Sequence, residues 1–218
     1  NSSNMLDRII GHEKIVSVLR RQRENGRAAH AYLFVGPEGV GRTTVAHAVI
    51  ASAAKQSRDE IASPADGRLA MTTVSRLADE KTGKLKSAIS VDQIRELRDT
   101  LAHTSLGGGT KSVFVEEADW LNAAAGNALL KTLEEPRGDT LIILRAPTVE
   151  SVPATVASRC QVIRFAFVSE TLIAESLVKR GIDREEAGHL ARLSNGCPGT
   201  AIRLLTDSAF RAERETGA

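Results

Sequence analysis

The chain has 218 residues; 42% are apolar, 26% are charged and only 3% are aromatic, and its 29 basic side chains nearly balance 27 acidic ones. A net charge of +2 gives no overall attraction for nucleic acid or a membrane surface, so any such binding has to be local. No apolar run approaches the roughly 20 residues of a membrane-spanning helix, and we expect a cytoplasmic protein without a membrane partner. The length allows one ordinary domain and a small second one.

Strand and helix patterns alternate over the first three quarters of the chain. In chain order they predict a helix at 13–23, a strand at 31–35, a helix at 43–54, a strand at 71–74, a helix at 91–101, a strand at 112–115, a helix at 127–133, and strands at 141–144 and 162–165. Residues 55–88 give the weakest signal, with a turn at 81–84 in a basic hairpin, and residues 107–109 predict another turn. Apolar strands that alternate with helices indicate an α/β fold, with a parallel sheet and helices on both faces.

From Ser169 onward the pattern is helical throughout. Helices are predicted at 169–180, 183–194 and 198–214, and they form a separate three-helix domain. We expect the boundary within 165–168, which gives a sheet domain over residues 1–166 and a small helical domain over residues 167–218.

A glycine-rich segment joins the strand predicted at 31–35 to the helix that follows it. Gly36, Gly39 and Gly41 precede the hydroxyl residues Thr43 and Thr44, in the spacing of a P-loop. The glycines let backbone amides surround phosphate groups, and the amino end of the helix adds positive potential. The alternative is a glycine-rich turn without a ligand. The strand, the spacing and the helix together favour the P-loop.

An arginine stands where a P-loop has its lysine. Lysine places a compact charge on the β- and γ-phosphates, whereas the guanidinium of Arg42 is larger, planar and forked, so it is not an equivalent replacement. We therefore expect impaired catalysis, while residual binding of ATP or ADP with Mg²⁺ stays open.

The strand predicted at 112–115 ends in two acids. An ATPase has an aspartate here that helps to hold Mg²⁺, followed by a glutamate that polarises water. Glu117 has the catalytic place, but Glu116 replaces the aspartate, and its extra methylene displaces the carboxylate by about 1.5 Å. We assign Glu116 to a degenerate nucleotide site and treat Glu117 as vestigial. An acidic strand end that faces solvent is the alternative.

Four strings of residues resemble one protein family. His30-Ala-Tyr-Leu-Phe34, Glu117-Ala-Asp119, the segment Asn127–Pro136 and Ser158-Arg-Cys160 are similar to the AAA+ subunits of bacterial DNA polymerase III clamp loaders. The resemblance covers about residues 7–206. It implies an AAA+ P-loop domain followed by a helical lid, and a part in placing the sliding clamp on primed DNA.

The resemblance also implies a choice between an ATP-hydrolysing motor of the γ/τ type and a non-hydrolysing stator. Ala146 aligns with the motor's sensor-1 Thr or Ser, and Gly199 with its sensor-2 arginine, for which Arg203 one helical turn later is a candidate substitute. Together with Arg42 and Glu116, these changes favour a stator without intrinsic ATPase and without a required cofactor. An active motor that tolerates Arg42 and Glu116 is the alternative.

The arginine of Ser158-Arg-Cys160 is retained as Arg159. In the family this residue enters the neighbouring subunit's ATP site and stabilises charge on the transferred phosphate, as an arginine finger. The resemblance thus implies γ/τ and δ subunits as partners, with the sliding clamp and primed DNA reached through the assembled loader. A salt bridge at the entrance of a strand is the plainer interpretation of Arg159.

The sequence departs from the family in two ways. Residues 55–88 contain no cysteine, so the four-cysteine zinc module of many relatives cannot form there. Cys160 and Cys197 lack ligand spacing, which predicts no metal site and favours two reduced thiols over a single disulfide. The chain also ends just after the helical lid, so we expect a piece that lacks the collar domain of complete subunits.

Direct DNA binding is a further alternative. The basic positions around Arg20 to Arg23 and Lys81 to Lys86 would have to carry it. They form no stripe and have no aromatic residues between them, so solvated faces are favoured.

Overall fold

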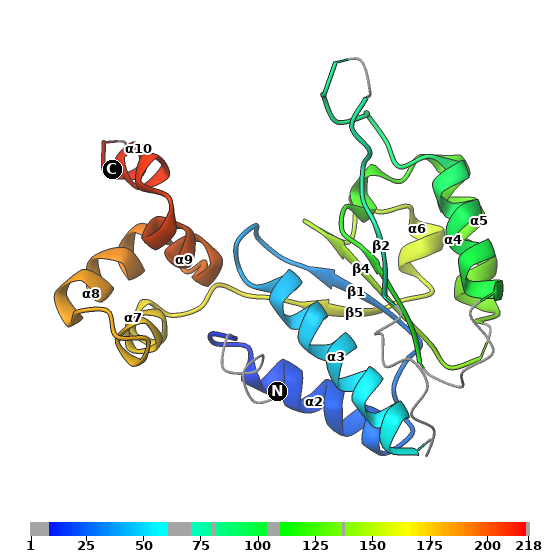
Figure 1. Ribbon diagram of the computed structural model, residues 1–218, viewed down its shortest axis with the longest axis horizontal. Coiled ribbons are helices and arrows are strands. Elements are labelled where there is room, and N and C mark those ends of the chain that lie inside the picture. The colour runs from blue at the N-terminus through cyan, green and yellow to red at the C-terminus, as the bar shows by residue number, and fades with distance from the viewer. Residues whose placement is uncertain (1–8, 61–70, 80–81, 104–109, 137, 217–218) are drawn as a thin grey trace.

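The computed structural model describes residues 9–60, 71–79, 82–103, 110–136 and 138–216, with the side chains of 54–60 and of residue 103 outside the description. In chain order the elements are α2 (Glu13–Glu24), β1 (Ala31–Val35), α3 (Arg42–Glu60), β2 (Met71–Val74), α4 (Val91–His103), β3 (Lys111–Val115), the 3-10 turn η1 (Ala118–Trp120), α5 (Ala123–Glu134), β4 (Thr140–Ala146), α6 (Ala154–Ala157), β5 (Gln161–Arg164), α7 (Glu170–Lys179), α8 (Arg184–Leu193), α9 (Pro198–Thr206) and α10 (Ser208–Thr216) (Figure 1).

The five strands form one parallel sheet in the order β2-β3-β4-β1-β5 (Figure 1). Strand β1 lies between β4 and β5; Leu33 is paired with Leu144 on one side and with Val162 on the other. All five predicted strands are confirmed, and so is the α/β sheet with helices on both faces. Because every strand runs the same way, all their carboxyl ends lie along one edge, which we call the carboxyl edge of the sheet.

The alternation of side chains along each strand sets the two layers of the core. Leu33, Val113 and Ile142 lie on one face, in a buried cluster with residues of α4, α5 and α6. Phe34 and Phe114 lie on the other face, in a cluster with residues of α2 and α3. Figure 1 shows the same division, with α2 and α3 below the sheet and α4, α5 and α6 on the far side.

Helices α3 and α5 extend furthest beyond their predicted bounds, while α2 and α4 end within two residues of theirs. Helix α3 begins at Arg42 and reaches Glu60 rather than ending at residue 54. Helix α5 begins at Ala123 rather than at residue 127, because the Asn122 side chain accepts a hydrogen bond from the Ala125 amide at 2.7 Å and caps the helix.

Pairing outside the main sheet supports the predicted hairpin. Ala78 and Leu85 form an antiparallel bridge, and the Asp79 amide donates to the Lys84 carbonyl at 2.8 Å. Residues 80 and 81, and the turn predicted at 107–109, lie outside the described residues.

The C-terminal part contains four helices where three were predicted. The expected helix at 198–214 is divided into α9 and α10 at Asp207, whose backbone is extended (φ −121°, ψ 95°). The Asp207 carboxylate accepts from the Phe210 amide at 2.9 Å and so begins the new helix. Helices α7, α8 and α9 share their own buried cluster, to which Ile10 and Val168 also belong. We call α7–α10 the helical lid, and its predicted boundary as a domain stays a prediction.

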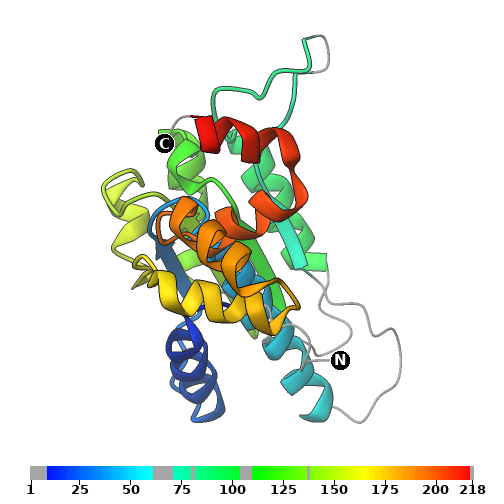
Figure 2. The ribbon, with the colours of Figure 1, turned by 90° about the vertical axis from the view of Figure 1, so that its left-hand side faces the viewer.

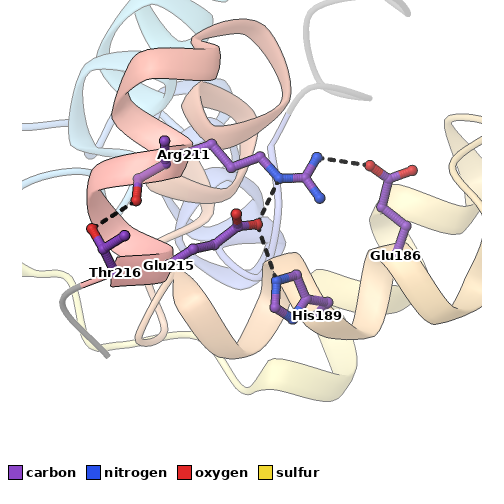
Figure 3. Close-up of polar contacts among 6 residues, drawn as sticks. Glu186, His189, Arg211, Glu215 and Thr216 are labelled. Atoms are coloured by element: carbon purple, nitrogen blue, oxygen red, sulfur yellow. Dashed lines mark hydrogen bonds and ion pairs between the residues drawn. The ribbon is translucent and has the colours of Figure 1, made fainter.

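Helix α10 is fastened to α8 by a polar network (Figure 3). Arg211 donates to Glu186 on α8 and to Glu215 on its own helix, both at 2.9 Å, and Glu215 also contacts His189 on α8 at 3.3 Å. The contacts orient α10 on the lid, although such exposed pairs add little stability.

No described helix is long and apolar enough to cross a membrane. Cys160 and Cys197 are both free thiols, and burial raises the pKa of Cys160 to about 12.

The helical lid lies directly against the glycine-rich loop, and Figure 2 shows it in front of the sheet. The Gly199 amide, at the start of α9, donates to the Gly39 carbonyl at 2.7 Å. A Cβ at Gly199 would lie 2.8 Å from that carbonyl oxygen and 3.3 Å from the Gly39 Cα. Glycine at 199 therefore lets two backbones touch, and any larger residue at this position would force the lid away from the loop.

We expect Gly199→Ala to destabilise the protein by about 1–3 kcal/mol, as overpacking does. The control is Gly188→Ala on α8, where a Cβ meets only Arg192 Nη1 at 3.7 Å. That change should be neutral or stabilising, because alanine favours a helix over glycine by about 1 kcal/mol. Urea unfolding of both variants checks the contact, and equal stability of the two would contradict it.

Candidate functional site

The glycine-rich loop connects the end of β1 to the start of α3 at the carboxyl edge. Gly36, Gly39 and Gly41 have φ values of 150°, 75° and 112°, a region that other residues rarely adopt. A Cβ at Gly36 would also lie 2.5 Å from the Phe165 carbonyl oxygen. The loop thus has the curled conformation that a P-loop needs, and its glycines are required for it.

Contacts from three directions hold this loop. The Gly36 amide donates to the Pro147 carbonyl at 3.1 Å, which ties the loop to the end of β4. The buried His12 ring makes a 3.0 Å hydrogen bond between Nε2 and the Val40 carbonyl, and burial lowers the pKa of His12. With Gly199 on the third side, the loop is in contact with the end of β4, with His12 and with the lid.

Arg42 is turned into the protein. It is only 7% exposed, and its Nη1 donates to the carbonyl oxygen of Ala146 at the end of β4. Burial, and then the nearby positive charge of Arg145, lower the pKa of Arg42. The guanidinium is therefore held by a backbone carbonyl beside the loop, with a second cation close by.

That second cation, Arg145, links the parts of the site. Its Nη1 donates to the Thr43 hydroxyl at 2.8 Å and its Nε donates to the Glu116 carbonyl at 2.7 Å. One side chain of β4 thus joins the first turn of α3 to the acidic end of β3. Arg145 is not among the site residues predicted from the sequence. Its signal was a charge at the end of the otherwise apolar strand from Leu141 to Leu144.

Glu117 is bound by an arginine of the same chain. Arg76, just after β2, donates to the two carboxylate oxygens at 2.8 Å from Nη2 and 3.2 Å from Nε, and its backbone amide donates at 3.0 Å. The hydrogen bond from the Arg76 side chain lowers the pKa of Glu117. The guanidinium also lies over the Trp120 ring, 4.0 Å from its centroid. A carboxylate held in this way is poorly placed to polarise water.

Two cavities of more than 400 Å³ border the loop. The larger, about 730 Å³, is lined by Arg76, Glu116, Glu117, Asp119 and Trp120 together with loop and β4 residues. The smaller, about 420 Å³, lies between the loop and the lid and includes Thr43 and Thr44. Glu38, Arg42 and Arg145 line both. The structure thus brings together every residue assigned to the nucleotide site, and Glu117 with them.

The lid contributes arginines to the smaller cavity. Arg203 and Arg214 both line it, and Arg203 stacks on Phe210 at 3.9 Å and pairs with Asp207 at 3.4 Å. Arg203 therefore faces the loop even though Gly199, at the aligned position, carries no side chain.

Arg159 lies apart from this site. It precedes β5, whose first residue, Gln161, pairs with Tyr32 near the start of β1. Because the strands are parallel, Arg159 is at the edge opposite the loop, beyond the four residues of β5, roughly 13 Å of strand. Its Nε donates to Glu134 at 2.7 Å and its Nη1 donates to the Thr155 carbonyl at 2.9 Å. The salt bridge expected on the plainer interpretation is present.

Three of the four family-like strings of residues lie in contact with one another around Arg159. His30, which opens the string at 30–34, contacts the Leu133 carbonyl through Nε2 at 2.7 Å, and Glu134 next to it holds Arg159. Three of the four strings therefore form one structural unit at the amino edge of the sheet.

Arg76→Gln should raise the pKa of Glu117 toward its ordinary value of 4.5, because the hydrogen bonds to the carboxylate are lost. A lowered folded-state pKa means that the pair stabilises the fold fully above pH 4.5 and loses this effect as the pH falls through the lowered pKa. The stability gap between wild type and variant should therefore shrink on acidification.

Carboxyl NMR titration and unfolding at several pH values measure both effects. Arg95→Gln, which removes an exposed pair with Asp92, is the control and should leave Glu117 unchanged. An unaltered Glu117 titration in Arg76→Gln would contradict the assignment.

The chain is similar in sequence to known subunits of bacterial DNA polymerase III. The family described as DNA polymerase III, delta subunit, matches residues 11–169. Subunit delta′ of Escherichia coli DNA polymerase III is 39% identical over 135 residues, 61% of this chain and 40% of that protein. Subunit delta′ of Pseudomonas aeruginosa is 34% identical over 187 residues, 82% of this chain and 57% of that one. Subunit tau of Bacillus subtilis is 29% identical over 206 residues, 90% of this chain and 36% of that one.

Solved structures share the fold. The RuvB Holliday junction branch migration motor of Thermotoga maritima superposes with a TM-score of 0.61 at 18% identity, covering 89% of this chain and 60% of that one. A DNA polymerase III gamma subunit-related protein from the same organism has a TM-score of 0.50 at 19% identity, covering 82% of this chain and 57% of that one.

The chain spans less than two thirds of the length of each of these relatives. The family match, however, runs from before α2 to the end of the sheet and covers the loop, the acidic strand end and Arg159. The chain therefore belongs to the DNA polymerase III delta-subunit family, as a clamp-loader subunit of the delta-prime type.

Proposed function

We propose that this subunit is a non-hydrolysing stator of the clamp loader, which helps to load the sliding clamp onto primed DNA. The proposal rests on one observation: arginines of this chain bind the side chains that an active ATPase would use for catalysis. Arg145 donates to the hydroxyl of Thr43, and Arg76 binds the carboxylate of Glu117. Both groups would have to be free for metal-assisted attack of water on a phosphate. We propose accordingly that the subunit needs no cofactor for its role.

The second part of the proposal concerns Arg159, as a finger for a neighbouring ATPase subunit. Its position supports this, since it lies at the edge opposite its own loop and its side chain is 36% exposed. A finger has to leave Glu134 when it meets the neighbour's phosphate. The exchange is plausible in energy because a partly exposed ion pair is weak, whereas a finger on a transferring phosphoryl group contributes far more.

The partners follow from the same proposal. We infer that γ/τ and δ subunits are the direct neighbours, that the clamp and primed DNA are contacted in the assembled loader, and that the complex acts in the cytoplasm. We also propose that residues 1–166 form an AAA+ domain and residues 167–218 a helical lid domain.

An active motor is the second candidate, since gamma and tau subunits are also among the similar proteins. The P-loop conformation of the glycines and the presence of Glu117 favour it. The contacts of Glu117 with Arg76 and of Thr43 with Arg145 weigh against a motor, because both contacts would have to break before catalysis.

Arg159→Ala in a loader reconstituted from this subunit and its partners should reduce ATP turnover at the neighbouring site by on the order of 10³-fold, because the charge on the transferred phosphate loses its partner. Steady-state phosphate release by the loader, with assembly checked by gel filtration, measures this.

The matched control is Glu134→Gln, which weakens the salt bridge to Arg159 but keeps the guanidinium. Turnover should survive in that variant. Undiminished turnover with Arg159→Ala would refute the finger, and an equal loss in both variants would show that the salt bridge merely supports the fold.

A further inference from the structure

Four guanidinium groups surround the cavity between the loop and the lid. Arg42 and Arg145 come from the sheet side and Arg203 and Arg214 from the lid, while Glu38 is the one carboxylate among the lining residues. The remaining lining includes backbone of Gly39 and Gly41 and the hydroxyls of Thr43 and Thr44. Because Arg203 is paired with Asp207, three guanidinium groups and one carboxylate remain around about 420 Å³, and this excess of positive charge favours an anion.

The position of Arg145 decides whether Mg²⁺ can bind in this cavity together with an anion. In a P-loop the hydroxyl after the lysine position is a ligand of Mg²⁺, and here that hydroxyl is Thr43 Oγ1. Magnesium binds oxygen at about 2.0–2.1 Å with strict octahedral geometry. The same oxygen accepts a hydrogen bond from Arg145 Nη1 at 2.8 Å. A divalent ion bound there would meet the guanidinium at close range, so the residues present do not fit Mg²⁺.

Arg145 is also held from a second direction, which keeps it at this place. Its Nε donates to the Glu116 carbonyl at 2.7 Å, so the planar group is fixed by two hydrogen bonds from different segments. Since β4 positions its backbone, the side chain cannot swing away without breaking both bonds.

The charges around Arg145 are incompletely balanced. Arg42 lies beside it; burial, and then repulsion by Arg145, lower the pKa of Arg42, while Glu38 and Asp119 act in the opposite direction. Phosphate oxygens would relieve this repulsion, and guanidinium groups bind them in paired, charge-assisted hydrogen bonds.

We infer that Arg145 is a built-in cation in place of Mg²⁺, and that the loop binds the phosphate chain of a nucleotide or pyrophosphate without metal. The role is one of binding, and it involves no bond cleavage. It goes beyond the stator proposal and does not depend on it, because it concerns this chain's own loop rather than the neighbour's active site.

The test is calorimetric titration of the chain with ATP and, separately, with pyrophosphate, each in EDTA and in excess Mg²⁺. Both anions should bind in EDTA, and Mg²⁺ should leave affinity unchanged or reduce it, because the bound metal brings a cation toward Arg145. A requirement for Mg²⁺, or the absence of binding in EDTA, would overturn the inference. Binding of ATP with no binding of pyrophosphate would overturn its assignment to the phosphate chain.

Arg145→Leu should weaken binding in EDTA by roughly 10-fold or more, as expected for loss of charge-assisted hydrogen bonds. Arg21→Leu, an exposed change on α2 outside both cavities, is the control and should bind as wild type. Equal affinities of Arg145→Leu and Arg21→Leu would refute the role of Arg145.

If Arg145→Leu does not fold, the four titrations of the wild-type chain decide the question alone. Loader turnover with Arg159→Ala is a separate readout, so the two proposals can fail independently.

Discussion

Parallel pairing of all five strands is the constraint from which the site follows. It places the carboxyl ends of β1, β3 and β4 along one edge of the sheet. The glycine loop follows β1, Glu116 and Glu117 follow β3, and Arg145 and Ala146 end β4. It also sends Arg159, which precedes β5, to the opposite edge. One topological fact therefore places the glycine-rich loop and Arg159 at opposite edges of the sheet.

At the carboxyl edge, three arginines of the chain donate hydrogen bonds to groups of the candidate site. Arg42 binds the carbonyl of Ala146, Arg145 binds the hydroxyl of Thr43, and Arg76 holds Glu117. Gly199 completes the arrangement by letting the lid rest on the loop, backbone against backbone. The candidate site is therefore held by hydrogen bonds that the chain makes with itself.

The sequence predicted the sheet well, because the central strands β1, β3 and β4 are buried on both faces and appear as short apolar runs. The P-loop and the acidic strand end were recognisable from spacing alone. Helix ends were less certain: the cap at Asn122 and the break at Asp207 depend on local side-chain hydrogen bonds. Arg145 left a readable signal, a charge within an apolar strand. Arg76 left none, since it reaches Glu117 only through the pairing of β2 with β3.

Phosphate release by the isolated chain, with ATP and Mg²⁺, distinguishes a stator from a motor. A stator should release phosphate no faster than buffer alone and should not change on Glu117→Gln, because Arg76 already binds that carboxylate. Magnesium-dependent release that disappears in Glu117→Gln would contradict the stator proposal and would identify the subunit as a motor.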